Sequence, residues 1–300
     1  MYKINNISLS AYNIIAGRAP NSMIAMTGVL DMPKRTGKTF HSWGDHHGVE
    51  PYVSASEIFF AGRELAFYGL VKAEDRPSAV YLLKGFYKLL NGFSDLVPFE
   101  TPYGTFQVYL KEEIKVSYLS DGWCQMVLKL QERIVSIPTP VLPIISNYGV
   151  YGIDGIPFKN IGAFVVSTDG NLNRPGTKKQ SIESYGSEGY EITKNKLQKF
   201  KVNLVFQGVD FDGLKENVGM LHRILASEGL HDLNIDGTGL KIWAVNGFKV
   251  KSIREWVAEL EVELLVNDLT SLYAEGLNLI DNSGSSVVDN NEDQIIFKTE

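Results

Sequence analysis

The sequence predicts an α+β fold that is mostly β and consists of two tandem domains. Each domain is expected to be an antiparallel β-sandwich or barrel with one packed α-helix and a closing β-hairpin. Strand-like stretches with apolar residues at alternate positions fill most of the chain, and each half contains one amphipathic helical stretch. The elements also follow the same order in both halves, which predicts an internal duplication.

The duplication is visible as similar residues at a slowly falling offset. Gly28–Asp45 matches Gly170–Ser187 at an offset of 142, and Leu65 matches Leu204 at an offset of 139. The helical stretches match at 135 and the strands after them at 134. The alternative is that strands and Gly-Pro turns merely look alike. The shared order and the small drift of the offset favour two copies with short loop deletions in the second.

Composition limits the class of protein. The chain has 300 residues, of which 44% are hydrophobic, enough for two packed cores. A net charge of −6 argues against a nucleic-acid groove built on bulk positive charge. Cys124 is the single cysteine, so an intramolecular disulfide and a thiolate metal cluster are excluded. Met1–Gly17 lacks the pattern of a signal peptide, and no apolar run reaches transmembrane length.

The first part of each copy is expected to be rich in strands. Met1–Leu9 and Asn21–Leu30 each predict a strand, and Tyr52–Leu70 predicts more. Between them, Lys34–Val49 is long, polar and Gly-rich, which indicates a loop or loose hairpin. Its counterpart in the second copy is Gly176–Gly189.

One amphipathic helix is predicted in each copy. Pro77 suits the first turn of the first helix, and Asp212 is the expected N-cap of the second. The helices should end near Gly92 and Gly229. Their apolar stripes are Val80, Leu83, Tyr87 and Leu90 in the first helix, and Leu214, Val218, Leu221 and Leu225 in the second.

Strands follow each helix. In the second copy, Asn246-Gly247 predicts a β-hairpin that joins Leu240–Ala244 to Phe248–Ile253. The copies close with strands at Trp123–Leu130 and Trp256–Leu264.

These elements predict domains at residues 1–134 and 148–268, joined by a stiff Pro-rich linker at 135–147. A polar arm at 269–300 follows, and its composition predicts a disordered tail. The alternative is that Gln294–Lys298 pairs with the edge of a neighbouring sheet.

Three stretches of the sequence carry residues that could do chemistry. His41, His46 and His47 are spaced closely enough to bind a metal, but the matched loop of the second copy has no histidine, so no metal is expected. Arg35–Thr39 resembles the end of a phosphate-binding loop, but Met32 stands where that motif requires glycine. The alternating glutamates at Glu259–Glu263 are typical of a strand with one solvent-exposed face. We therefore expect neither an enzyme nor a cofactor.

The order of elements resembles the tail-tube-type domain of bacteriophage tail proteins, in particular the distal tail protein and baseplate hub group. The resemblance covers about Ile4–Asp268: a β-rich start, a long polar loop, an antiparallel sheet, one helix after a Gly-Val-Asp strand end and a closing hairpin. Tyr148–Phe158, followed by Gly162 and the turn at Leu172–Pro175, is similar to the start of such domains in phage and prophage proteins.

The resemblance implies a structural, ring-forming component of a phage or prophage-derived tail tip or baseplate, which connects the tail tube to distal or receptor-binding parts. Distal tail proteins carry one such domain plus an unrelated one and form hexamers, whereas hub proteins of contractile tails carry two and form trimers. The tandem here favours a pseudo-six-fold trimer over a hexamer. Other tail and baseplate proteins would be partners, and DNA would only pass through the channel. The expected location is the virion tail, after synthesis in the bacterial cytoplasm, with no membrane insertion.

An alternative function is a carbohydrate- or ligand-binding tandem β-sandwich, in which Trp43, Tyr52, Tyr185 and Tyr190 stack on sugars. Loop packing explains these aromatic residues more simply. In the ring interpretation, the residues expected at interfaces are Lys34, Arg35, Lys38, Trp43, Lys178, Lys179, Tyr185, Ile295, Ile296 and Phe297.

Overall fold

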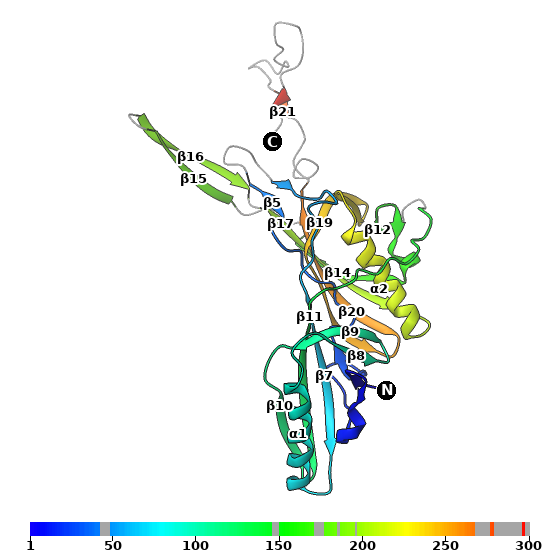
Figure 1. Cartoon of the computed structure of the whole chain (residues 1–300). Helices are drawn as coiled ribbons and strands as arrows, with labels where there is room; N and C mark the ends of the chain where they lie inside the picture. The colour runs from blue at the N-terminus through cyan, green and yellow to red at the C-terminus, as the bar shows by residue number, and fades with distance from the viewer. Residues whose placement is uncertain are drawn as a thin grey trace.

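The structure is a computed structural model that describes residues 1–42, 49–145, 150–170, 177–184, 187–195, 197–267, 277–278 and 296–297. It contains two large antiparallel sheets, each with one long α-helix packed against it (Figure 1). The predicted α+β, mostly β fold class is confirmed. Residues 1–134 and 148–267 are called the first and second halves below; the domain boundaries themselves remain a prediction.

Nine strands of the first half form its large sheet, and two short strands, β5 and β6, pair with each other. Its elements are β1 (Lys3–Ile4), β2 (Ile7–Ser8), the 3-10 helix η1 (Leu9–Tyr12), β3 (Ile14–Ala16), β4 (Met26–Thr27), β5 (Phe40–His41), β6 (Glu50–Pro51), β7 (Arg63–Lys72), α1 (Arg76–Asn91), β8 (Val97–Thr101), β9 (Gly104–Leu110), β10 (Lys115–Ser120) and β11 (Trp123–Glu132).

The second half repeats most of this order. Its elements are β12 (Tyr151–Ile153), β13 (Ile156–Pro157), η2 (Phe158–Ile161), β14 (Ala163–Asp169), β15 (Thr177–Ser184), β16 (Ser187–Asn195), β17 (Gln198–Gln207), α2 (Phe211–Ala226), β18 (His231–Ile235), β19 (Thr238–Arg254) and β20 (Val257–Val266). In the C-terminal arm, β21 (Leu277–Asn278) pairs with β22 (Ile296–Phe297).

The two large sheets share one topology. The first runs β2-β1-β8-β9-β11-β7-β3, with β10 beside β11 and β4 beside β7, and the second runs β13-β12-β18-β19-β20-β17-β14. Each strand of the second order occupies the place of its counterpart in the first. The repeat seen in the sequence therefore corresponds to a repeated arrangement of strands.

Strand register corrects one part of the sequence alignment. Arg63 pairs with Glu132 in the first sheet, and Gln198 pairs with Val266 in the second. The offset between β7 and β17 is therefore 135, the same as between the helices, and not 139. Leu65 thus corresponds to Phe200. The error of four residues left the alternation of faces intact because side chains in a strand repeat every two residues.

The helix caps differ from the prediction in the second half. Asp75 accepts a hydrogen bond from the Ser78 N–H (2.9 Å), and Asp210 accepts one from the Gly213 N–H (2.7 Å). Asp210 is therefore the N-cap, and Asp212 lies in the first turn. The prediction of Asp212 was wrong because both aspartates stand at the start of the pattern and only one has the extended backbone that capping requires.

The buried faces of the helices are mostly as predicted. Pro77 lies in the first turn of α1, and all four predicted residues of α2 are buried. In α1 the stripe is rotated: Ala79 and Phe86 are buried, and Val80 and Tyr87 are only half-buried. The buried stripe of α1 is Ala79, Leu83, Phe86 and Leu90.

The hairpin predicted at Asn246-Gly247 does not exist. β19 is one strand of 17 residues, and the segments on both sides of Asn246-Gly247 pair with β20, through Ile242 with Val266 and Phe248 with Val262. Asn246-Gly247 lies within an irregular register between these pairs. In the first half the same path is broken into β9 and β10, which both pair with β11.

The core is continuous across the chain. Buried apolar residues of both halves belong to one cluster, in which Leu30 and Met32 of the first half join Leu221 and Phe248 of the second. The linker packs alongside α2, where the Arg223 guanidinium donates a hydrogen bond to the Pro140 carbonyl (2.6 Å). No helix in the described part of the chain has the length and apolar character needed to cross a bilayer.

Candidate assembly interface

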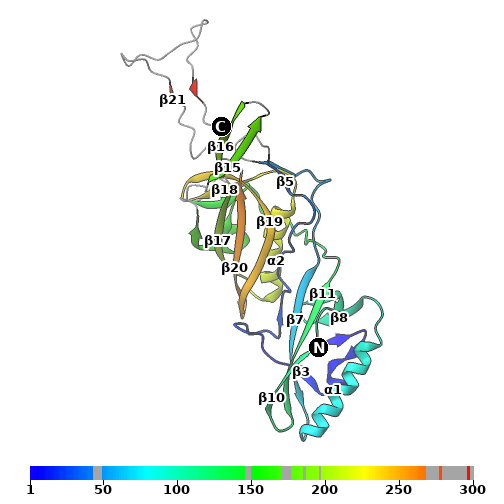
Figure 2. The same ribbon diagram turned by 90° about the vertical axis from the view of Figure 1, so that its left-hand side faces the viewer.

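A long segment of the first half packs on the second half. We call residues 17–60, between β3 and β7, the crossing segment; it includes β4, which pairs with β7. The Met23 N–H donates to the Ile253 carbonyl (2.8 Å), and the Met32 N–H donates to the Phe248 carbonyl (3.0 Å). In Figures 1 and 2, β5 lies beside the second sheet, although β7, which follows it, belongs to the first. The contact therefore joins unlike surfaces of two similar units.

The bulge in β19 lets the crossing segment approach. Gly247 has a φ of +61°, and a Cβ at this position would collide with the Met32 carbonyl oxygen. Beyond the bulge, the Val250 N–H donates to the Asp31 carboxylate (2.9 Å). Glycine at 247 thus serves a close backbone contact between the halves, not a turn.

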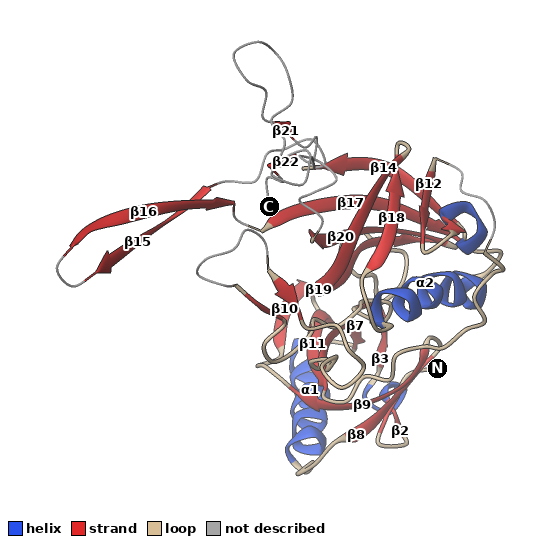
Figure 3. Cartoon of the chain, turned by 90° about the horizontal axis from the view of Figure 1, so that it is seen from above, coloured by secondary structure: helices blue, strands red, loops and turns tan. Residues whose placement is uncertain are grey.

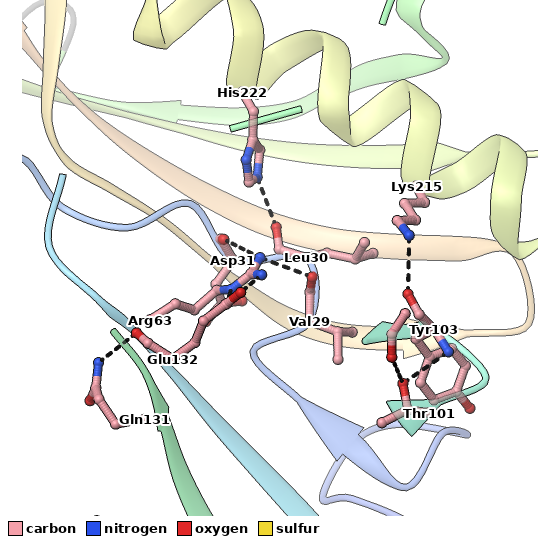
Figure 4. Close-up of polar contacts among 11 residues, drawn as sticks. Val29, Leu30, Asp31, Arg63, Thr101, Tyr103, Gln131, Glu132, Lys215 and His222 are labelled. Carbon is pink, nitrogen blue, oxygen red and sulfur yellow. Dashed lines mark hydrogen bonds and ion pairs between the residues drawn. The ribbon is translucent and has the colours of Figure 1, made fainter. Parts of the chain in front are cut away.

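Asp31 and His222 face this contact from opposite sides. Burial raises the pKa of Asp31 to about 6, while the hydrogen bond from Val250 opposes the shift. The His222 ring on α2 lies 3.0 Å from the Leu30 carbonyl through Nε2 and packs edge-on against Phe248 (Figure 4). Burial lowers the pKa of His222 to about 4, so the ring is neutral at pH 7. Since a carbonyl accepts, the neutral ring carries its proton on Nε2.

A buried ion pair holds the part of the crossing segment that follows β4. The Arg63 guanidinium donates to Glu132 Oε2 through Nε (2.9 Å) and Nη2 (2.7 Å). Its Nη1 donates to the carbonyls of Val29 (3.1 Å) and Asp31 (3.3 Å) (Figure 4). The two side chains are only 11% and 9% exposed. One arginine therefore ties β7 and β11 to the backbone that enters the interface.

A second contact joins the halves at the start of α2. Lys215 donates to the Tyr103 carbonyl (3.1 Å), and the ring of Tyr103 lies 4.6 Å from that of Phe211, centroid to centroid. Thr101 braces the Tyr103 turn by accepting from the Tyr103 N–H (3.0 Å) and donating to the Gly104 carbonyl (2.8 Å). The turn between β8 and β9 is thus shaped to meet α2.

Matched positions of the two halves differ in exposure. Trp243 in β19 is 1% exposed, whereas Tyr109, at the same position in β9, is 42% exposed. Leu110 is 39% exposed, and its counterpart Ala244 is 3% exposed. The surface that is closed in the second half is therefore open in the first.

The second half has its own excursion at the matching place in the chain. The crossing segment precedes β7, and the hairpin β15–β16 precedes β17. Its strands form a separate two-stranded sheet and extend away from both large sheets (Figures 1 and 3). The molecule thus has one excursion packed on its own chain and one projecting from it.

The structure places the predicted interface residues in different settings. Arg35 is 6% exposed, and its guanidinium donates to the carbonyls of Tyr52 and Glu57 in its own segment. Lys34 and Lys38 are exposed, and Lys38 Nζ lies 3.0 Å from His41 Nδ1. Among the described residues, which include His41, no group of three or more side chains could hold a metal ion.

The remaining predictions concern strands without described side chains or residues outside the description. Lys178 and Lys179 lie on β15, and Tyr190 lies on β16. Ile296 and Phe297 pair with Asn278 and Leu277 of the same arm. The residues outside the described ranges are Trp43, His46, His47, Tyr185 and Ile295.

Sequence reasoning missed the residues that join the halves. Leu30, Asp31 and Phe248 read as ordinary loop and strand residues. His222 gave a signal, because it follows Leu221 on the predicted apolar stripe of α2. A histidine at such a position needs a buried hydrogen-bond partner, which here comes from the other half.

Comparisons with known proteins are sparse. No protein-family model and no curated protein sequence matches this chain. Among solved structures, the chain is similar to the crystal structure of SPP1 Dit (gp 19.1), described as a paradigm of the hub adsorption apparatus in phages that infect Gram-positive bacteria. The TM-score is 0.34 and the sequence identity is 9%, over 89% of this chain and 98% of that chain. No family membership follows from these comparisons.

Proposed function

We propose that the protein is a non-catalytic structural subunit that assembles head to tail into a ring at a phage tail tip or baseplate. It would connect the tail tube to distal or receptor-binding proteins. The proposal is supported by the sequence resemblance to tail-tube-type domains and by the repeated topology of the two sheets. The observation that carries it is the packing of the crossing segment on β19 and α2.

That contact is heterologous, since the surface used by the first half differs from the surface used by the second. A heterologous contact that is repeated by rotation closes into a ring or continues as a filament. Each chain already contains one such contact between two similar units. Three chains would therefore provide six units with pseudo-six-fold symmetry, and a hexamer of chains is the second possibility.

One face of the second sheet suits the lining of an aqueous channel. Lys201 and Lys251 both contact Glu261, at 3.0 and 2.7 Å, and Lys199 contacts Glu263 at 3.0 Å. Such exposed pairs keep a strand face hydrated without a strong excess of either charge. In the proposed ring, a balanced face of this kind would let DNA pass without binding it tightly.

The proposal is tested by the mass of the protein in solution. Light scattering over a wide concentration range, with negative-stain images of the same samples, should show closed rings of three or six chains with a central hole. Glycan-array binding on the same preparation is the control for the carbohydrate-binding alternative. A monomer at every concentration that binds glycans would contradict the ring and favour that alternative.

A further inference from the structure

We propose that a groove at the C-terminal end of α1 binds the β15–β16 hairpin of a second copy of this chain. The inference rests on the head-to-tail association proposed above and assigns the surfaces that make the contact between chains. It follows from the difference between matched surfaces of the two halves.

The groove is a feature of the first half. It has a volume of about 730 Å³ and lies between the end of α1, the start of β8 and the end of β9. Phe93, Val97 and Leu110 provide apolar walls, and Tyr109 and Arg133 border it. Tyr109 and Leu110 are 42% and 39% exposed, so the groove offers apolar surface whose burial would stabilise a complex.

The matching place in the second half is occupied by the crossing segment. The Gly229 N–H, just after α2, donates to the Val53 carbonyl (2.8 Å), and the Arg35 N–H donates to the Val245 carbonyl beside Ala244 (2.7 Å). Trp243 and Ala244, the counterparts of Tyr109 and Leu110, are 1% and 3% exposed. The chain thus shows how this site is closed: an extended segment from the neighbouring unit lies across it.

The hairpin β15–β16 is the counterpart of that segment. The part of the crossing segment after β4 and the hairpin both leave the sheet after a matched glycine, Gly28 or Gly170, and both return at a matched strand, β7 or β17. The hairpin strands have 8 and 9 residues and would span about 25 Å at the usual rise of an extended chain. Because the hairpin projects from the molecule in Figures 1 and 3, it is placed to reach another chain.

A photo-crosslinking amino acid at position 109 tests the contact. Equal amounts of chains with ordinary and heavy nitrogen are mixed, irradiated and analysed by mass spectrometry. We expect crosslinks between position 109 of one chain and residues 177–195 of another, including pairs of mixed isotope. The same probe at Tyr81, which is 79% exposed on α1 and does not line the groove, should give none to this hairpin.

Two further variants measure the strength of the contact. Leu110→Asp, and a variant in which a short Gly-Ser link replaces residues 177–195, should each weaken self-association by about tenfold or more. Circular dichroism should show both variants folded, because Leu110 is partly exposed and the hairpin is a separate sheet.

The possible failures are distinguishable. Rings whose crosslinks from position 109 go elsewhere, or which assemble unchanged in both variants, would overturn the groove–hairpin contact and leave the ring itself standing. A chain that remains monomeric and gives no crosslinks between chains would overturn both.

Discussion

Gly28 and Gly170 occupy the same position in the two sheets and have nearly the same backbone conformation, with φ of +86° and +88°. Gly28 lies against the Glu64 carbonyl and Gly170 against the Lys199 carbonyl, two residues that are themselves matched at an offset of 135. Only glycine adopts this conformation without strain. The two points at which the chain leaves its sheet are therefore built in the same way.

Alanine at either glycine should destabilise the fold. A Cβ at position 170 would lie 2.8 Å from the Lys199 oxygen, and one at position 28 would lie closer still to the Glu64 oxygen. We expect losses above the roughly 1–2 kcal/mol of left-handed backbone strain alone, with Gly28→Ala the larger, measured by urea unfolding. Gly37→Ala is the control, because Gly37 has a φ of +75° and open space around it. Equal losses for Gly28→Ala and Gly37→Ala would contradict the steric explanation.

The helix caps predict a contrast within α2. Asp210→Ala should lower the free energy of unfolding by about 1 kcal/mol, because the Gly213 N–H loses its acceptor. Asp212→Ala should cost only a few tenths of a kcal/mol, from the lost charge near the helix N-terminus. Asp75→Ala should match Asp210→Ala. Chemical denaturation distinguishes these outcomes, and equal effects of Asp210→Ala and Asp212→Ala would refute the assignment of the cap.

His222 should make the contact between the two halves sensitive to acid. Its pKa falls from 6.5 to about 4 on folding, so between these values the unfolded chain binds the extra proton. Stability from this group is therefore complete above pH 6.5 and is lost as the pH falls to 4, by about 3 kcal/mol in total. His222→Gln should flatten this part of the pH–stability curve. An unchanged slope between pH 6.5 and 4 would show that the ring is not held neutral.

Asp31 should act in the opposite direction. Its pKa rises from 3.8 to about 6 on folding, so the folded chain holds the extra proton between these values. The group destabilises the fold progressively as the pH rises from 3.8 to 6. Asp31→Asn keeps an oxygen for the Val250 N–H and should gain stability relative to wild type between pH 4 and 7. Thermal unfolding at several pH values measures this gain, and a constant difference would contradict it.

The Arg63–Glu132 pair should be far more important than a surface pair. Glu132→Gln leaves the Arg63 charge without a charged partner in a site that is about nine-tenths buried, and should cost about 3 kcal/mol. The matched control is Glu263→Gln, which removes an ion pair whose lysine side chain is 62% exposed and should cost under about 1 kcal/mol. Equal costs in denaturant titrations would mean that the buried pair contributes no more than the exposed one.

The sequence predicted the features that depend on local periodicity. The stripe from Leu214 to Leu225 faces the core because residues three or four apart share one face of a helix. Asn246-Gly247 misled the prediction because a glycine with positive φ serves a bulge as well as a turn. Only the pairing of both flanking segments with β20 decides between the two, and that pairing is not a local property.

The candidate interface depends on contacts that are distant in the chain. Ser22 donates to the Ile253 carbonyl across 231 positions, and His222 meets Leu30 across 192. The residues around one partner do not indicate which residue it will contact, because the contact requires both sheets to be formed and correctly placed. The duplication predicted that two similar units exist; how one unit packs on the other emerges only in three dimensions.

The crossing segment also has a consequence for biosynthesis. The N-terminal half leaves the ribosome first, so Ser22 waits for more than 200 further residues before its partner Ile253 has been translated. The nascent first half therefore carries apolar side chains and unpaired backbone groups that only the second half can bury and pair. β19, by contrast, is translated after the crossing segment that packs on it, so its contact surface can be covered as soon as the second sheet forms. The order of translation therefore means that the second half folds in the presence of the segment that covers it.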